Sequence, residues 1–355
     1  FRRVLFRSQD YSIIDSTIIN GSQPVHADTA SCVLFISGET SSAVLQGFTL
    51  TGGKGTKWLD EHGAGYYIEG GGVLIALSSP VVRLNIIRNN DVNRGGGSST
   101  GGGGIRLGDA SPQILNNLII RNKGMYGGGI VSNFATPVIR NNLIAYNQVS
   151  QAVSGPSYGG GGIWINSNPA TIENNTIVHN SSYGTGGGSA GRGGAIASID
   201  GGSATGKGNI IWGNIQASGV QIYGPASFSY SDIEESLPGT GNISLVPIFA
   251  DTNYHLSANS PGIDAGDPGP AYNDPENAYD LGRARYPSKG GLRNDMGTYG
   301  GPLTSAFDGN VFVPPILTVV DSGTGTGVSA SWYPGQSPFA SAGNYTLMYG
   351  TSQIA

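Results

Sequence analysis

The chain has 355 residues and a net charge of -5, and only 12% of its residues are charged. Its Lys and Arg residues form no basic stripe, which nucleic-acid binding needs in order to neutralise phosphates, so that class of partner is excluded. No apolar run reaches the length of a membrane-spanning helix, so no transmembrane segment is predicted. Cys32 is the single cysteine, which excludes an internal disulfide.

Glycine accounts for 60 residues, but without the every-third-residue spacing of collagen. The hydrophobic share of 38% is modest for a chain of this length. A solenoid needs only a few apolar residues in each repeat, so this composition favours a repeat protein over one central globular core.

The first residues, Phe1 to Ser8, resemble the translation of a sequencing adapter. We expect residues 1–8 to be a non-native scar and leave them out of the interpretation of the fold. Because the chain begins without Met, we also expect its natural N-terminus, with any signal peptide, to lie outside this sequence.

From residue 9 onward the chain repeats one unit, in which a glycine-rich run is followed by an aliphatic opening residue. Apolar residues or Asn recur nine, twelve, fourteen and seventeen residues after that residue. In the unit that opens at Ile105 they are Ile114, Asn117, Ile119 and Asn122. The opening residues of successive units are Ile36, Val73, Ile105, Ile130, Ile163 and Ile196.

This spacing predicts three short strands in each unit, separated by turns. Because side chains alternate along a strand, the recurring aliphatic residues point inward, and stacking places Ile119, Ile144 and Ile177 in one column. Asn in stacked turns can adopt the left-handed conformation and bond to the Asn of the next coil. The sequence therefore predicts an all-β fold, a right-handed parallel β-helix over residues 9–250. A left-handed hexapeptide helix has a shorter and stricter period, so it is the less favoured solenoid.

The length of the unit varies between the last Asn of one coil and the glycine run of the next. We expect loops there, all leaving one edge of the solenoid, and insertions gathered on one face often mark a binding face. These loops are residues 54–71, 91–103, 123–128, 148–161 and 181–194.

After the repeat, the chain reads Ser-Pro-Gly-Ile-Asp-Ala-Gly from Ser260 and Asp-Met-Gly-Thr-Tyr-Gly from Asp295. These stretches resemble the C-terminal module of bacterial secreted and surface right-handed parallel β-helix proteins of the pectate-lyase-like superfamily. That module has Ser-Pro-Ala-Ile-Asp-Ala-Gly followed by a closing Asp-Ile-Gly-Ala-Tyr-Glu. The departures from it are Gly262, Met296, Thr298 and Gly300.

The resemblance covers roughly residues 10–302 and implies the fold and an extracellular or cell-surface location, but no particular reaction. By its Pro, Gly and Asp content, the anchor-like segment 251–302 is expected to form a cap that covers the open edge of the last coil.

Residues 303–315 are expected to be a linker. After it, residues 316–355 contain stretches that alternate with the period of a strand and resemble the start of a fibronectin type III domain, with Trp332 and Tyr345 as core aromatics. Such a β-sandwich needs about 100 residues, so we expect this one to be truncated.

Aromatic residues in the expected loops indicate a function. Aromatic rings fixed on a rigid scaffold can stack on sugar rings, so polysaccharide is the predicted partner of this chain, which we expect to act as a monomeric binding or adhesion module. The alternative is that the rings only cover glycine-rich turns. The candidate residues are Trp58, Tyr66, Tyr67, Tyr126, Tyr158, Trp164 and Tyr183.

Two other functions remain open. A polysaccharide lyase that acts on acidic glycans by β-elimination needs a base, and Arg83 and Arg140 share one outward row, with Leu115 between them and Glu173 after them. A glycoside hydrolase is disfavoured, because no pair of Asp residues occurs on neighbouring coils. A structural stalk without any ligand is the third reading.

Calcium is the one cofactor that the sequence suggests, because Ca²⁺ prefers oxygen ligands. Asp is also a common turn residue, so the same residues can simply shape the C-terminal segment. The candidate ligands are Asp264, Asp267, Asp274, Asp280 and Asp295.

Overall fold

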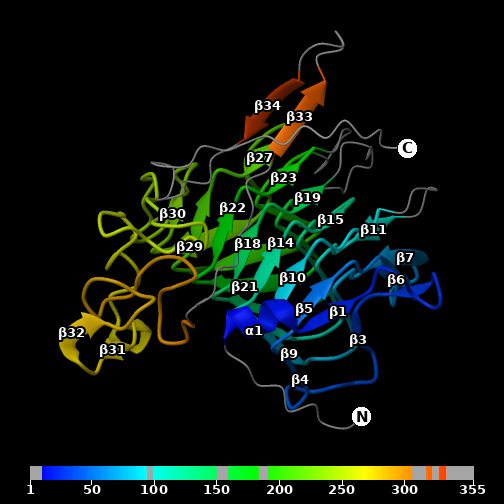
Figure 1. Ribbon diagram of the computed structural model, residues 1–355, viewed down its shortest axis with the longest axis horizontal. Coiled ribbons are helices and arrows are strands. Elements are labelled where there is room, and N and C mark those ends of the chain that lie inside the picture. The colour runs from blue at the N-terminus through cyan, green and yellow to red at the C-terminus, as the bar shows by residue number, and fades with distance from the viewer. Residues whose placement is uncertain are drawn as a thin grey trace.

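The computed structural model describes residues 10–93, 99–149, 159–183 and 191–305, together with the backbone of 317–321 and 328–332. The chain forms a right-handed parallel β-helix, as its repeat predicts, with the first coils at one end and the last coils at the other (Figure 1). The helical elements within the described residues are short: α1 (Tyr11–Ser16) and the 3-10 helix η1 (Pro270–Tyr272).

Each complete coil contributes one strand to each of three parallel sheets. The first sheet contains β3 (Val33–Phe35), β8 (Val73–Ala76), β12 (Ile105–Gly108), β16 (Ile130–Asn133), β20 (Ile163–Asn166), β24 (Ile196–Ile199) and β28 (Ile222–Tyr223). The second contains β4 (Val44–Gln46), β9 (Val81–Arg83), β13 (Gln113–Leu115), β17 (Val138–Arg140), β21 (Pro169–Glu173), β25 (Ser203–Lys207) and β29 (Ala226–Ser229). The third contains β1 (Ile18–Asn20), β5 (Thr49–Thr51), β10 (Ile86–Arg88), β14 (Leu118–Ile120), β18 (Leu143–Ala145), β22 (Thr176–Val178), β26 (Ile210–Trp212) and β30 (Asp232–Ile233).

The interior follows the sequence offsets. In the third sheet Ile119 pairs in register with Ile144, and Ile144 with Ile177, and all three side chains are fully buried. Two internal ladders of Asn side chains run parallel to these columns. In one of them Asn117 donates to Asn142 at 3.0 Å, which continues the ladder from coil to coil. Each ladder amide also satisfies buried backbone groups, so the polar turns are stabilised without water.

Two details of the predicted repeat are wrong. The left-handed conformation belongs to the residue before each ladder Asn, as at Asn116 (φ 53) and Asn141 (φ 54), and not to the ladder Asn itself. In the first coil, Val33 and not Ile36 pairs with Val73, and Ile36 lies exposed just beyond strand β3.

The expected loops also contain more regular structure than the sequence indicates. A fourth, short parallel sheet follows the last ladder Asn of four coils, and the segment 54–71 folds into an antiparallel hairpin that belongs to a fifth sheet. The fourth sheet contains β15 (Lys123–Gly124), β19 (Gln148–Val149), β23 (Ser181–Ser182) and β27 (Ile215–Gln216). The fifth contains β2 (Thr29–Ala30), β6 (Gly55–Leu59), β7 (Tyr66–Glu69) and β11 (Thr100–Gly101).

The segment 251–302 does not lie over the open end of the last coil, as the expected cap would; it reaches that coil at its side, where Tyr230 packs against a cluster with Leu256 and Met296. It docks on the outward side of the third sheet, where Tyr254 and Tyr299 join an apolar cluster with Leu118 and Leu143. Helix α1 covers the same cluster near the first coils through Tyr11. The end of the last coil is instead met by the preceding stretch, whose backbone bonds to β30: the amide of Ile233 donates to the carbonyl of Ile243 at 3.0 Å.

Docking of this segment depends on the outward Asn of the Asn-Asn pairs. The side-chain amide of Asn141 donates to the carbonyls of Thr298 (3.0 Å) and Gly300 (2.7 Å). The amide of Asn174 bonds in the same way to the carbonyl of Asp295 at 3.1 Å. In these two pairs, therefore, the first Asn holds the C-terminal segment, and the second, Asn142 or Asn175, builds the internal ladder.

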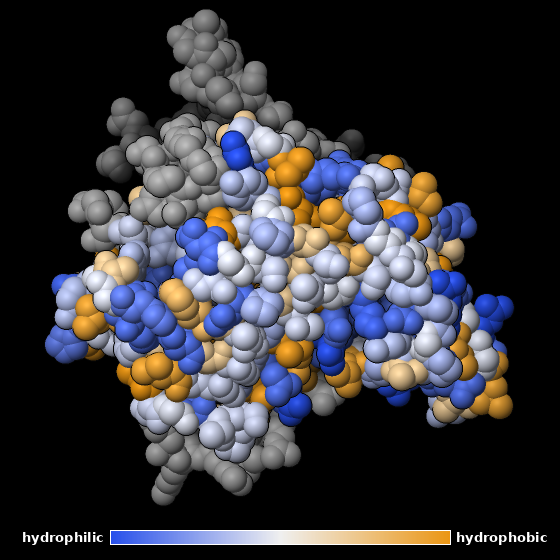
Figure 2. Space-filling model, turned by 180° about the vertical axis from the view of Figure 1, so that it is seen from behind, coloured by the Kyte–Doolittle hydropathy of each residue, from blue (hydrophilic) through white to orange (hydrophobic). Residues whose placement is uncertain are grey.

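Beyond residue 305, β33 (Leu317–Asp321) and β34 (Val328–Trp332) pair antiparallel. They coincide with two of the stretches that resemble a fibronectin type III domain, whereas Tyr345 lies outside the described residues. A small antiparallel hairpin, β31 (Glu276–Asn277) and β32 (Asp280–Ala284), projects from the C-terminal segment. Seen from behind, hydrophobic and hydrophilic residues are interspersed over the described surface (Figure 2).

Candidate functional site

The outward face of the first sheet carries the most elaborate group of polar side chains. Strand β12 alternates, so Ile105 and Leu107 enter the core while Arg106 points outward, to the hairpin β6–β7. Gly108 is required next to it, because a Cβ at that position would overlap the guanidinium of Arg106. The hairpin therefore covers Arg106, whose guanidinium occupies the space that Gly108 leaves free.

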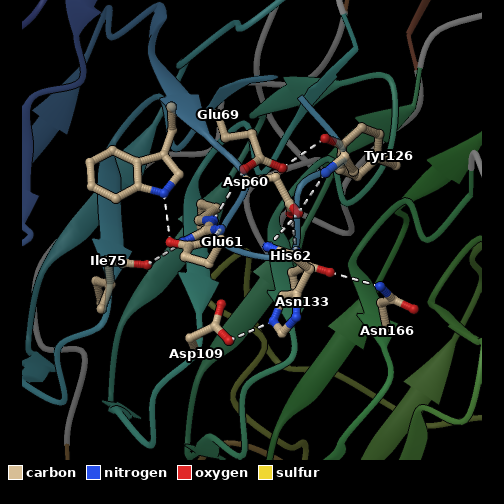
Figure 3. Close-up of polar contacts among 12 residues, drawn as sticks. Asp60, Glu61, His62, Glu69, Ile75, Asp109, Tyr126, Asn133 and Asn166 are labelled. Atoms are coloured by element: carbon tan, nitrogen blue, oxygen red, sulfur yellow. Dashed lines mark hydrogen bonds and ion pairs between the residues drawn. The ribbon is translucent and has the colours of Figure 1, made fainter. Parts of the chain in front are cut away.

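Arg106 is fully buried and holds two carboxylates of the hairpin (Figure 3). Its Nε donates to Glu69 at 3.1 Å and its Nη2 to Glu61 at 3.0 Å, while Nη1 donates to the carbonyl of Ile75 at 3.2 Å. The remaining carboxylate oxygens are also occupied, because Trp58 donates to Glu61 at 2.6 Å and Tyr126 to Glu69 at 2.7 Å.

The two carboxylates differ in their ionisation. Burial raises the pKa of Glu69 and outweighs the opposing charge of Arg106. Burial also opposes ionisation of Glu61, but the hydrogen bond and the charge of Arg106 outweigh it, so the pKa of Glu61 lies below its usual value. Two neighbouring acids whose pKa values are shifted in opposite directions can mark a catalytic site. Here every carboxylate oxygen already has a partner, so the cluster clamps the hairpin to the solenoid.

The solvent-facing margin of this clamp is more open. His62, in the loop between β6 and β7, bonds to Asp109 at 2.8 Å and stacks on Phe134 with ring centroids 3.6 Å apart. Beside it, Asn133 donates to Asp60 at 3.3 Å and accepts from Asn166 at 2.7 Å. We call His62, Asp109, Phe134, Asn133 and Asn166 the hairpin margin; together they offer an aromatic surface and amide and carboxylate groups.

A family model described as "Right handed beta helix region" matches residues 4–237, which span the coils described above. The chain belongs to this family. No curated protein and no solved structure matches it. Among the described residues of this β-helix protein, no helix is both long and apolar enough to cross a membrane.

The β-helix separates the predicted aromatic residues into two groups. Tyr126 and Trp164 are only 4% and 7% exposed, and their rings lie 4.9 Å apart in a cluster with Val131. They cover the outward face of the first sheet, which is the alternative reading of these residues, and cannot stack on a sugar where they lie.

The other aromatic residues differ in access. Tyr66 is 61% exposed on the solvent-facing side of the hairpin, with Lys57 over its ring at 5.0 Å. Trp58, Tyr67 and Tyr183 are half-buried. Tyr158 lies outside the described residues.

The arginine row of the second sheet exists, but its cations are engaged. Register pairs Arg83 with Leu115, Leu115 with Arg140 and Arg140 with Glu173, as the sequence predicts. Arg140 forms an ion pair with Glu173, its Nε lying 2.9 Å from the carboxylate, and Arg83 donates to Gln46 at 2.8 Å. Neither arginine is free to take a proton from a substrate, so this row lends no support to a lyase.

The candidate calcium ligands serve the backbone of the C-terminal segment. Asp295 accepts from the amides of Asp264 and Lys289, both at 2.8 Å, and Asp274 accepts from the amide of Asp295 at 3.0 Å. Asp264 accepts from the amide of Gly291.

The other two candidates lie elsewhere. Asp267 forms an ion pair with Lys207 at 2.8 Å, and Asp280 is exposed on β32. Within the described residues, no group of three or more His, Cys, Asp or Glu side chains is placed to hold a metal ion. The structure therefore gives these acids a role in shaping turns and brings no set of calcium ligands together.

Sequence reasoning missed the clamp and most of the hairpin margin. The one available signal was the expected loop 54–71, which contains Asp60, Glu61, His62 and Glu69. Its partner Arg106 lies 37 residues beyond Glu69, on another coil. No spacing rule connects the two, so only the fold could bring them together.

Proposed function

We propose that this β-helix protein is an extracellular or cell-surface protein that binds polysaccharide at the hairpin margin and at Tyr66. The observation that carries the proposal is the combination of aromatic surface and hydrogen-bonding groups on one rigid face. His62 stacks on Phe134, and the bonded pair Asn133 and Asn166 lies next to them. Binding sites of this kind combine apolar contact with a few fixed polar groups.

Rigidity of the scaffold supports this reading. The margin is supplied by strands β12, β16 and β20, which pair in register, and by a hairpin clamped through the buried Arg106. Groups fixed in this way lose little conformational entropy when a ligand binds. A parallel solenoid also repeats its strands every 4.7–4.9 Å or so, which suits an extended chain of sugar units running along its axis.

The proposal is tested by titrating the full chain with a panel of oligosaccharides in a calorimeter. We expect Tyr66→Ala and His62→Ala each to weaken binding by about tenfold, equivalent to about 1.4 kcal/mol. Tyr279→Ala is the matched control, because Tyr279 is 99% exposed but lies beside β31 and β32, far from the hairpin (Figure 1).

Two results would contradict the proposal. If no oligosaccharide binds, the solenoid is better read as a structural stalk. If uronate oligosaccharides give an unsaturated product that absorbs in the ultraviolet, the protein is a lyase. The location is checked separately: the protein on intact cells of its source should be accessible to an added protease.

A further inference from the structure

We infer that the hairpin margin selects glycans without carboxylate or sulfate groups. This inference rests on the proposed function and specifies its ligand. It is the reverse of the expectation that a basic row would hold an acidic glycan, and it follows from the charges that the fold gathers around the margin.

Carboxylates outnumber cations around this margin. Among the described residues, the one guanidinium that lies with these acids, on Arg106, is fully buried and bonded to two carboxylates, so it is not accessible to a ligand. The acids of this region are Asp60, Glu61, Glu69, Asp109 and Asp200.

The register places Asp200 in the same row as Asp109. Asn133, Asn166 and Ile199 are aligned on β16, β20 and β24, and Asp200 directly follows Ile199, as Phe134 follows Asn133. Asp109 follows Gly108, which is aligned with Asn133. Asp109 and Asp200 therefore occupy two positions of one row along the axis of the solenoid, which continues beyond Asp109 to Leu77, the residue after Ala76.

The other cations near this sheet are directed elsewhere. Lys57 lies over the ring of Tyr66 and 3.9 Å from Asp28, and Arg192 stacks on Tyr223 at 5.0 Å, on the last strand β28. His62 is hydrogen-bonded to Asp109. A carboxylate or sulfate placed on the margin itself would meet like charge, and such a contact is unfavourable. Lys57 is exposed, but it lies at Tyr66 and not among the margin residues.

A hydroxyl or amine fits the same groups. The Oδ2 atom of Asp109 is buried and has no hydrogen-bond partner within the described part of the chain. Its negative charge disfavours an anion on the margin, whereas a hydroxyl or amine carries a hydrogen to donate that a carboxylate group lacks. The amide of Asn166, which is half-buried, can serve a hydroxyl as donor or as acceptor, and the buried Asn133 holds it in place.

The experiment compares three probes on the full chain: neutral glucose oligosaccharides, chitosan oligosaccharides and galacturonate oligosaccharides of equal length. We expect one of the first two to bind at least about tenfold more tightly than the galacturonate series at low salt. The difference should shrink at high salt, because salt screens the repulsion.

The test variant is Asp109→Asn combined with Asp200→Asn. Both positions have positive φ (50 and 48), which Asn tolerates as well as Asp, so the change removes charge and leaves the backbone unstrained. We expect the ratio of the two affinities to fall by at least about threefold. A threefold change corresponds to about half the free energy of a tenfold change. Asp280→Asn, on the distant β32, is the matched control and should change nothing.

The outcomes separate failure of the glycan preference from failure of polysaccharide binding. Galacturonate that binds as tightly as the neutral and amino sugars would overturn this inference while leaving polysaccharide binding intact. A preference that the double variant does not change would also overturn it. Failure of all three probes to bind would overturn the proposed function itself, and the inference with it.

Discussion

The outward faces of the first and third sheets lie on the same solenoid but are covered by different means. On the third sheet, helix α1 and the C-terminal segment bury an apolar face that includes Leu118, Leu143 and Tyr299. On the first sheet, the hairpin β6–β7 is held by the charged cluster of Arg106, Glu61 and Glu69. The inner stack is the same beneath both faces, so the difference comes only from the residues that point outward.

This difference separates a structural face from a candidate binding face. Apolar burial is non-directional and stabilises the long C-terminal segment over several coils. A buried ion cluster gives little net stability, but it requires one geometry. The hairpin is thus fixed precisely enough to hold the margin residues in place, and its solvent-facing side remains polar.

The largest expected effect comes from removing the charge that holds the hairpin. Arg106→Met should leave Glu61 and Glu69 without their cation and lower the free energy of unfolding by about 3 kcal/mol. Denaturant titration measures it. Arg83→Met, on the exposed row, is the control and should cost under about 0.5 kcal/mol.

A second variant distinguishes the loss of the Arg106 ion pairs from the cost of leaving a buried carboxylate without a cation. Adding Glu69→Gln to Arg106→Met should recover part of the lost stability, because one buried charge without a partner is removed. If Arg106→Met costs no more than Arg83→Met, the cluster does not hold the hairpin, and the comparison of the two faces fails.

A smaller effect is expected where the C-terminal segment meets the outward Asn row. Asn141→Gly keeps the positive φ of that turn but removes both hydrogen bonds to Thr298 and Gly300, so unfolding should cost about 1–2 kcal/mol less. Hydrogen exchange at Gly297 should accelerate more than exchange in the solenoid. Asn89→Gly is the control, since Asn89 also has positive φ (55) but is exposed. Equal exchange in both variants would contradict the docking role.

The last prediction concerns the pH dependence of stability that comes from the acids of the C-terminal segment. Burial, and then the charge of Asp295, raises the pKa of Asp274 to about 8. Burial, and then the charge of Asp264, raises the pKa of Asp295 to about 7. Because both values lie above the ordinary pKa of 3.8, the stability that these groups contribute is complete below about pH 4. It is lost as the pH rises through 7 and then 8.

Thermal unfolding at pH 5 and pH 8 measures this dependence. The free energy of unfolding should fall by up to about 1.4 kcal/mol per pH unit for each group. The variant Asp274→Asn should show a shallower dependence than the natural chain. A stability that rises with pH over this range would instead show that the backbone amides which bond to these carboxylates keep them ionised.

The sequence alone predicted the solenoid and its interior. The inward positions repeat at fixed offsets because each coil must present the same residue to the same column, so Ile119, Ile144 and Ile177 could be aligned without coordinates. The internal Asn ladder was predicted for the same reason. The arginine row of the second sheet followed from the offsets too, although its pairing with Glu173 changed its meaning.

Tertiary structure decided what covers the outward positions and what their side chains do. The roles of Tyr126 and Trp164 changed from sugar contact to packing because the hairpin and its neighbours cover them, which no offset reveals. Asn141 and Asn174 were indistinguishable in sequence from the ladder Asn that follows each of them, yet they hold a segment more than 120 residues away. Inward positions are fixed by the repeat itself, whereas outward positions depend on which non-repeating segment comes to lie over them.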